Sequence, residues 1–366
     1  MGFFDCGVDI DCEALLKNLR REGTPDRAHH MELFLDAEIR SAVDKRFNLE
    51  EGMDKTDPYH FLKLKIKRRR FLGYDYVEIS IGDMEVAVRN IDFPSRGAVA
   101  NDTAGLHKKQ GRRWVDEHDG AIRNWEEFEA YPWPDPKNAD AGVLEWFEKN
   151  LPDDMCVAAN CHNIFENLNF LMGYETLCYA MFDQPDLIDA ICERVGTIFY
   201  DLCGILLQFD RVKILFGGDD LGFKTGTLVS PEFLKEKILP WHKKMARRAH
   251  EHGRLYLLHS CGNIESVMDA LIGDVRIDGK HSFEDTIEKV EDAKKKYGEQ
   301  IALIGGIDVD FLCRADETAI RKRVREVLDA CMPGGGYCLG TGNTVANYIP
   351  LENYLVMLDE GRKYHL

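Results

Sequence analysis

The segment LLHSCGN, residues 257–263, places an imidazole and a thiol two residues apart at the end of a short apolar run. Side chains at positions i and i+2 of a strand point to the same side, so His259 and Cys261 are predicted to converge on one point. Imidazole nitrogen and thiolate sulfur are ligands that zinc accepts in proteins. The pair is half of a metal site, and a further ligand has to come from another part of the chain.

Short apolar runs alternate with longer amphipathic segments along most of the sequence. Eight runs are predicted as strands, at 30–35, 75–80, 155–160, 212–217, 254–259, 275–280, 301–306 and 335–340. Helical patterns lie at 57–72, 185–208, 231–252, 264–272, 286–297 and 316–331. Eight βα units in series predict an α/β fold, a (β/α)8 TIM barrel, as a single domain over residues 1–366. A doubly wound open sheet is the alternative, but no GxGxxG motif opens a helix after the first strand.

Two regions fall outside this βα rhythm. Residues 1–24 are predicted as a helical extension that covers the base of the barrel. Residues 82–136 are predicted as an insertion that contains a hairpin. Its turn is placed near Asp119-Gly120, because Asp-Gly is a preferred two-residue hairpin turn.

The composition argues against some classes of partner. The 366 residues include 47 Lys and Arg against 64 Asp and Glu, and the net charge of −17 disfavours nucleic acids and anionic membranes as partners. No run approaches the roughly 20 uncharged apolar residues that span a bilayer. Because the acidic N-terminus also lacks a signal-peptide pattern, we expect a cytoplasmic protein. The eleven cysteines are scattered, so most are expected to be reduced and buried.

Polar side chains gather at the predicted carboxyl ends of the strands, where TIM barrels carry out their chemistry. The set comprises Glu32, Asp36, Glu78, Asn160, His162, Asp219, Asp220, His259, Cys261, His281, Glu284, Asp308 and Cys338. Cys338 lies in GGGYCLGTGN on the eighth strand, whose end faces the barrel mouth together with the end of the fifth. His259, Cys261 and Cys338 are therefore predicted to hold zinc and to leave one position open for substrate. The alternative for Cys338 is a packed residue of the barrel interior.

Two adjacent carboxylates, Asp219 and Asp220, follow the fourth predicted strand. Neighbouring carboxylates shift each other's pKa, and we predict that at least one of the two orients a substrate or assists proton transfer. In the alternative interpretation, one of them caps the following turn and the other is solvated.

Several segments together resemble the uroporphyrinogen decarboxylase superfamily over nearly the whole chain. They are PDR at 25–27, GGDDLGFKTGTLVSPEFLKEKILPWHKKM, LLHSCGNI, ALIGGIDVDFL and GGGYCLGTGN. Within that superfamily, His-x-Cys followed by a distant Cys is similar to the zinc-dependent methylcobamide methyltransferases and, more remotely, to cobalamin-independent methionine synthase. The resemblance implies a TIM barrel with zinc ligands at His259, Cys261 and Cys338.

The fourth zinc position stays open in this comparison. Methionine synthase relatives use a glutamate about one strand later, and here the segment GKHSFED offers Glu284 and His281. Glu32, on the first strand, is a further candidate, either for this position or as a catalytic carboxylate.

The resemblance implies a zinc-dependent methyltransferase that moves a methyl group between a corrinoid and a small-molecule donor or a thiol-type acceptor. The corrinoid would be carried by a partner protein, and the direction of transfer stays open. The decarboxylase itself holds propionate groups with an arginine-rich RQAGR stretch, whereas HHMELFLDAEIR stands here. The alternative is a metal-independent decarboxylase that acts on another carboxylated substrate through Asp219 or Asp220, and a non-catalytic binding subunit is a third possibility.

Overall fold

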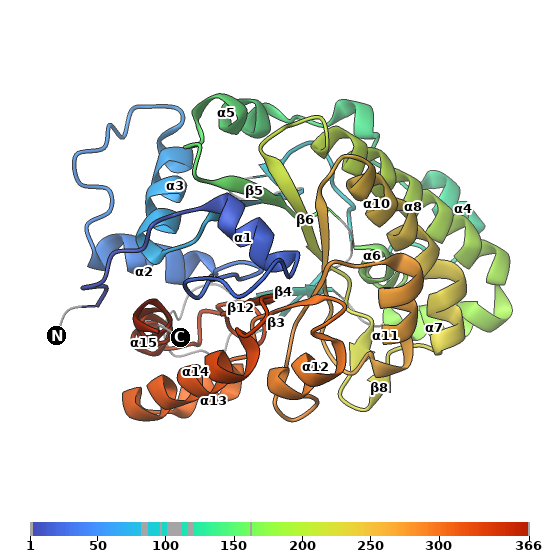
Figure 1. The fold of residues 1–366 in the computed structure, drawn as a ribbon. Helices are drawn as coiled ribbons and strands as arrows, with labels where there is room; N and C mark the ends of the chain where they lie inside the picture. The colour runs from blue at the N-terminus through green and yellow to red at the C-terminus, as the bar shows by residue number, and fades with distance from the viewer. Residues whose placement is uncertain are drawn as a thin grey trace.

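Eight parallel strands form one curled sheet with helices around it, which confirms the predicted (β/α)8 barrel (Figure 1). The computed structural model describes residues 3–81, 87–95, 97–100, 112–115, 120–161 and 163–364. In the order in which they lie side by side, the strands are β12 (Tyr337–Cys338), β11 (Ala302–Ile304), β10 (Gly279–His281), β9 (Leu255–His259), β6 (Val212–Gly218), β5 (Cys156–Ala159), β1 (Tyr76–Ile81) and β2 (Ala87–Val88). Seven of them coincide with predicted strands, and β2 was not predicted.

The first predicted strand, 30–35, does not form a continuous ladder. It meets the segment after β12 through isolated parallel bridges, His30 with Leu339 and Leu35 with Val345. Towards β1, the hydroxyl of Tyr76 donates to the carbonyl of Glu32 at 2.7 Å and accepts its N–H at 2.9 Å. One buried side chain therefore supplies bonds that a ladder would otherwise supply where the barrel closes.

The N-terminal extension covers the base of the barrel, as predicted. Helix α1 (Cys12–Leu19) begins at Asp11, whose side chain accepts the N–H of Ala14. At its end, the Asn18 amide donates to the carbonyl of Tyr337 at 2.7 Å, and this contact holds α1 beside the start of β12 (Figure 1).

The insertion contains an antiparallel hairpin of β3 (Gly97–Ala100) and β4 (Arg112–Val115), which confirms that prediction. Both strands precede the predicted turn, so the turn was placed too late in the chain; Asp119 itself lies outside the described residues. The insertion continues through α4 (Trp125–Ala130) and a 3-10 turn (Pro136–Asn138).

The remaining helices surround the sheet. They are α2 (Ala37–Arg46), α3 (His60–Leu72), α5 (Gly142–Asn150), α6 (Ile164–Met172), α7 (Tyr174–Asp183), α8 (Pro185–Leu206), α9 (Pro231–Phe233), α10 (Leu239–Glu251), α11 (Glu265–Ala270), α12 (Val290–Tyr297), α13 (Val309–Arg314), α14 (Glu317–Cys331) and α15 (Leu351–Lys363). A π-helical turn at Leu234–Ile238 interrupts one predicted helix, and a second at Leu271–Val275 ends another. A short hairpin, β7 (Gly222–Phe223) with β8 (Gly226–Thr227), follows β6.

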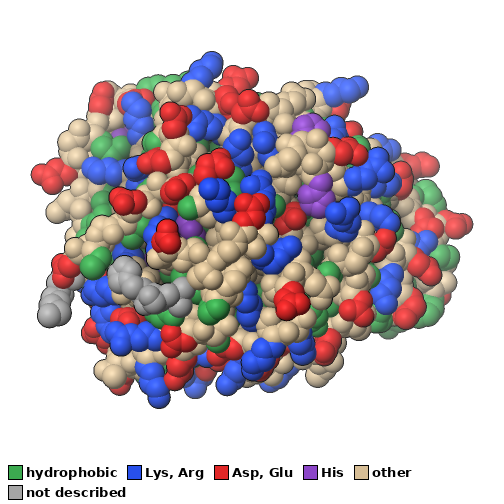
Figure 2. Space-filling view, viewed as in Figure 1, with side chains coloured by type: hydrophobic (Ala, Val, Ile, Leu, Met, Phe, Trp, Pro, Cys, Tyr) green, Lys and Arg blue, Asp and Glu red, His purple; other side chains and the backbone are tan. Residues whose placement is uncertain are grey.

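The core consists of apolar side chains on both faces of the sheet. Strand β9, LYLLH, is buried at every position, which is typical of a parallel strand covered on two sides. All eleven cysteines are free and most are buried, as predicted. Basic and acidic side chains are interspersed over the face shown in Figure 2. None of the helices in the described part of the chain is long and apolar enough to cross a membrane.

Candidate metal centre

Asp220, His259 and Cys261 meet just beyond the carboxyl ends of β6 and β9. One ligand atom from each residue lies within 4.8 Å of the other two. The Sγ of Cys261 and the Oδ1 of Asp220 are each 3.4 Å from Nε2 of His259. Among the described residues, these three form the one group of three or more His, Cys, Asp and Glu side chains with this geometry. The structure therefore brings together the predicted His259–Cys261 pair and one of the two predicted aspartates.

The pairing of β6 with β9 sets the positions of these side chains. Gly218 pairs with His259, so the chain beyond β6 lies beside the chain beyond β9. A Cβ atom on Gly218 would lie 3.3 Å from Cδ2 of His259, which is tighter than ordinary contact, so glycine leaves room for the imidazole. Asp220, which follows β6, also accepts the backbone N–H of Cys261 at 2.8 Å. This bond holds the segment after β9, which carries the thiol, against the segment after β6.

The charges at the cluster suit a cation. Burial alone would raise the pKa of Asp220, but the hydrogen bond and positive charge of His259 and the N–H of Cys261 outweigh it and lower that pKa. Burial and the negative charge of Asp220 raise the pKa of Cys261 well above its usual range, so the thiol keeps its proton without a cation. A bound divalent ion reverses this preference, because it stabilises the thiolate directly.

Cys338 is not a member of the cluster, which corrects the prediction that it is the third ligand. Its Sγ is buried and accepts a hydrogen bond from Asn18 of α1 at 3.5 Å, on the side of the barrel base. Cys338 pairs with Ile304 inside the sheet, whereas Thr341 is the residue of this segment that contacts His281. Thr341 lies three residues beyond Cys338, which corresponds to about 10 Å along an extended chain.

Asn343 occupies the place that sequence reasoning gave to Cys338. Its side-chain amide donates to Sγ of Cys261 at 3.2 Å. It lies in the same glycine-rich segment, GGGYCLGTGN, five residues beyond Cys338. An amide donor, rather than a second thiol, therefore faces the Cys261 sulfur from the segment after β12.

Asp219 has a structural position instead of the predicted catalytic one. Its two oxygens accept the backbone N–H groups of Phe165 at 3.0 Å and Glu166 at 2.8 Å, in the first turn of α6. The same carboxylate contacts Nε2 of His242 at 2.8 Å, and both side chains are fully buried. Asp219 therefore binds the start of a helix from earlier in the chain, and not the following turn that the alternative interpretation gave it.

Glu32 is buried at the barrel seam and does not reach the cluster. Its carboxyl oxygens lie 2.8 Å from the backbone nitrogen and 2.6 Å from the hydroxyl of Thr341. Burial raises the pKa of Glu32 to about 8, although these hydrogen bonds act in the opposite direction.

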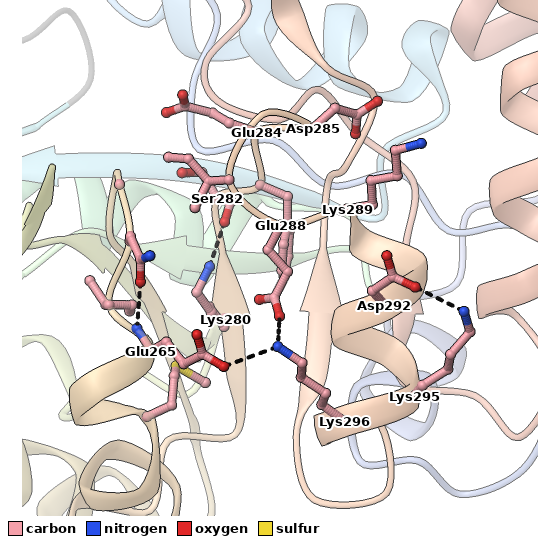
Figure 3. Close-up of a pocket in the computed structure, with 16 residues that line it drawn as sticks. Glu265, Lys280, Ser282, Glu284, Asp285, Glu288, Lys289, Asp292, Lys295 and Lys296 are labelled. Atoms are coloured by element: carbon pink, nitrogen blue, oxygen red, sulfur yellow. Dashed lines mark hydrogen bonds and ion pairs between the residues drawn. The ribbon is translucent and has the colours of Figure 1, made fainter. Parts of the chain in front are cut away.

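The two candidates for a fourth ligand also lie outside the cluster. His281 contacts the far side of the His259 ring, Nδ1 to Nδ1 at 2.7 Å. Glu284 is partly exposed and lines a pocket of 560 Å³ (Figure 3). The buried Lys280, whose pKa burial lowers to about 8, lines the same pocket, as does the ion pair of Lys296 with Glu288. Lys280 and His281 are consecutive in β10, so the pocket and the cluster lie on opposite faces of that strand.

Glu166 was missed by sequence reasoning. Burial, followed by the charges of Asp220 and Asp219, raises the pKa of Glu166 to about 8. A Cβ atom on Gly218 would lie 3.7 Å from its Oε2, beside the His259 ring. The available signal was NIFE, an Asn followed three residues later by Glu, which is a pattern for the start of a helix after a strand.

A hollow suited to a small molecule adjoins Glu166. This pocket of 400 Å³ opens at the carboxyl ends of β1 and β5 and is lined partly by Phe34, Phe93, Asn160 and Asn163. The amide of Asn163 donates to Oε2 of Glu166 at 2.6 Å. His162, another predicted candidate, lies outside the described residues.

Comparisons with known proteins agree with this architecture. Residues 118–364, more than half of the chain, match the model of the uroporphyrinogen decarboxylase (URO-D) family. No curated protein gives a significant match. The fold is similar to that of a methyltransferase from Methanosarcina mazei, with a TM-score of 0.65 and 16% identity over 96% of this chain and 97% of that one. A putative vitamin-B12 independent methionine synthase from Listeria monocytogenes matches with a TM-score of 0.48 and 14% identity, over 93% and 97% of the two chains.

At identities this low, the structural likeness shows a shared fold and leaves the activity open. The family match is a separate finding from the sequence, and it covers the strands and loops that carry the cluster. It also confirms the relationship indicated by the sequence motifs. The chain belongs to the uroporphyrinogen decarboxylase (URO-D) family.

Proposed function

We propose that this protein is a zinc-dependent methyltransferase that moves a methyl group between a corrinoid and a small-molecule donor or thiol acceptor. The observation that carries the proposal is the convergence of Asp220, His259 and Cys261 at the barrel mouth. The resemblance of the HxC motif to methylcobamide methyltransferases supports it, and so does the likeness in fold to a protein described as a methyltransferase.

The three side chains fit zinc by the chemistry of their donor atoms. An imidazole nitrogen, a thiol sulfur and a carboxylate oxygen are all zinc ligands in proteins, and three protein ligands leave a position open for substrate. A bound zinc ion lowers the pKa of a coordinated thiol and so supplies a thiolate at neutral pH.

Neighbouring residues of the chain prepare this site for a small molecule. Asn343 orients the Cys261 sulfur through its amide hydrogen bond. Glu166, with its pKa raised to about 8, is a carboxylic acid at neutral pH and holds a proton close to the cluster. The pocket of 400 Å³ next to Asn163 is within the size range of small-molecule sites.

The corrinoid in this proposal is carried by a partner protein that docks over the barrel mouth. Two aromatic side chains near the cluster support such a contact. Phe223, on the β7–β8 hairpin beside Asn263, is 62% exposed, and Tyr348, which lines a pocket together with Asn343, is 47% exposed. Exposed aromatic residues are enriched where proteins bind partners.

Metal analysis of the purified protein tests the proposed site. We expect about one equivalent of zinc in the wild type and a loss of most of it in Cys261→Ser, because a hydroxyl is a much poorer zinc ligand than a thiolate. Cys6→Ser, at an exposed cysteine, is the matched control and should keep the metal. Absence of zinc from the wild type, even after incubation with the ion, would contradict the proposal.

Methyl transfer is tested with free methylcobalamin and a small thiol as probes. We expect loss of the methylcobalamin absorbance with time, and restoration of the rate when zinc is returned to chelated protein. Chelation that leaves the rate unchanged would argue against a role for the metal.

The second candidate is a metal-independent decarboxylase of the URO-D type. The protonated Glu166 favours it, since loss of CO2 from a carboxylate leaves a carbanion that takes up one proton. This candidate predicts release of CO2 that survives both chelation and Cys261→Ser. Both oxygens of Asp219, which the sequence offered for this role, are already bound by N–H groups of α6, and one of them also contacts His242.

A further inference from the structure

Four hydrogen-bonded residues connect the barrel seam to the candidate metal centre. Glu32 contacts Thr341. The carbonyl of Thr341 lies 3.3 Å from Nε2 of His281, and Nδ1 of His281 lies 2.7 Å from Nδ1 of His259. All four residues are buried. The chain of contacts ends at the ring whose other nitrogen faces Cys261 and Asp220.

The positions of the hydrogens along this series of contacts follow from the carbonyl of Thr341. A carbonyl oxygen only accepts, so Nε2 of His281 carries a hydrogen and donates it to Thr341. His281 is fully buried beside the His259 ring, and across the 2.7 Å between the two Nδ1 atoms one imidazole donates a hydrogen and the other accepts it. Nδ1 of a neutral His281 with its hydrogen on Nε2 can only accept. His259 must then donate from Nδ1, so Nε2 is the nitrogen that faces Asp220 and Cys261 and is available to a metal ion.

We propose that His281 is a positioning residue that fixes the tautomer of His259, with the Thr341 carbonyl as the anchor, so that Nε2 of His259 is free to bind a metal. This inference rests on the proposed metal site and names a residue on which that site depends. Partners of this kind orient metal-binding histidines in many proteins, and their loss typically lowers metal affinity 10- to 100-fold.

Glu32 holds the anchor in place. The hydroxyl of Thr341 has one proton and two neighbouring oxygens, Glu32 Oε2 at 2.6 Å and the carbonyl of Asn343 at 2.8 Å. A protonated Glu32 satisfies both contacts, because it donates to the hydroxyl, which then donates to Asn343. The same carboxyl therefore fixes the carbonyl that faces His281 and the backbone of the residue whose amide contacts Cys261.

The tautomer can be read directly in metal-free protein by nitrogen-15 NMR of the histidine side chains. The His259 signals are assigned by their absence in His259→Asn. We expect the hydrogen on Nδ1 in the wild type, and a mixture of tautomers or hydrogen on Nε2 in His281→Leu. A wild-type ring with its hydrogen on Nε2, or no change in His281→Leu, would overturn the proposal.

Metal affinity provides the second readout, by competition between the protein and a chromophoric chelator for Co(II). We expect His281→Leu to bind 10- to 100-fold more weakly than the wild type. His281→Asn should recover most of that loss, because its amide can accept from His259 and donate to Thr341. His30→Leu, at a buried histidine packed against Gly361, is the control for loss of a buried ring and should bind as the wild type does.

The two proposals fail in different ways. If the wild type binds no metal, the proposed zinc function fails, and the NMR result alone decides the tautomer. If the wild type binds Co(II) and His281→Leu binds it equally well, the positioning role is overturned while the metal site stands.

Discussion

The ends of β9 and β12 present the same chemical group in two different settings. Cys261 lies two residues beyond β9, partly exposed, with His259, Asp220 and Asn343 around its sulfur. Cys338 lies within β12, fully buried, with the Asn18 amide as its hydrogen-bond partner. Burial raises the pKa of both thiols, so neither ionises readily without a cation. Whether a thiol can serve as a ligand therefore depends on its distance along the strand from the carboxyl end, where the barrel opens, more than on which strand carries it.

The largest expected effect separates the two cysteines by activity. Cys261→Ser should slow methyl transfer by about a hundredfold or more, because it removes a metal ligand. Cys338→Ser should change the rate little, and a methylcobalamin assay on the two variants side by side measures the difference. Equal losses of rate and zinc in both variants would return Cys338 to the ligand set.

Asp219 and Asp220 extend the comparison to two adjacent carboxylates. Asp219→Asn should lower the free energy of unfolding by about 2–3 kcal/mol, because its buried oxygens bind two N–H groups of α6 and His242. Asp220→Asn should leave stability nearly unchanged and weaken zinc binding, since an amide is a poorer ligand than a carboxylate. Denaturant unfolding measures the stability of both variants, and zinc titration measures their affinity for the metal. A destabilised Asp220→Asn that keeps wild-type zinc affinity would contradict it.

Glu32, which binds Thr341 in the segment beyond β12, is expected to make the stability of the protein depend on pH. Its folded pKa of about 8 lies above the ordinary value of 4.5 for a glutamate, so the unfolded chain releases this proton first as pH rises. The contribution to stability is complete below the unfolded pKa, declines as pH rises, and is lost above the folded pKa. We expect Glu32→Gln to show a shallower decline in unfolding free energy between about pH 5 and pH 8, by up to about 1.4 kcal/mol per pH unit. Identical slopes for wild type and variant would indicate an ionised Glu32.

The smallest expected effect concerns the packing of Cys338. Cys338→Ala removes one buried sulfur atom and its contact with Asn18, and should lower the unfolding free energy by about 1 kcal/mol without loss of zinc. Thermal unfolding with parallel metal analysis tests both parts. Retained stability together with lost zinc would reverse the roles assigned to the two thiols.

Much of the barrel was readable from the sequence, because buried parallel strands appear as short apolar runs between helical patterns. The segment 30–35 was predicted as a strand, but it forms only isolated bridges, and these and the bonds from Tyr76 depend on barrel closure. Strand β2 has two residues, too few to give a pattern.

The site was predictable where it depends on local geometry. His259 and Cys261 share one side of an extended chain, and the structure places them together. Cys338 was assigned by strand number alone, and a linear pattern does not show how far along its strand a residue lies from the barrel mouth. Glu166 was not predicted as a site residue because it lies in the first turn of α6, a helix that the sequence analysis did not predict. Its proximity to His259 depends on Asp219, 53 residues away, which caps that helix.

The closure of the barrel through the segment after β12 has a consequence for synthesis. Asp220, His259 and Cys261 leave the ribosome well before Thr341 and Asn343, which follow 80 or more residues after Cys261. A nascent chain therefore carries all three metal-binding groups before it carries the contacts that orient them. Only after the C-terminal segment has emerged and docked can His259 and Cys261 acquire these contacts, so the site is complete only once this segment is in place.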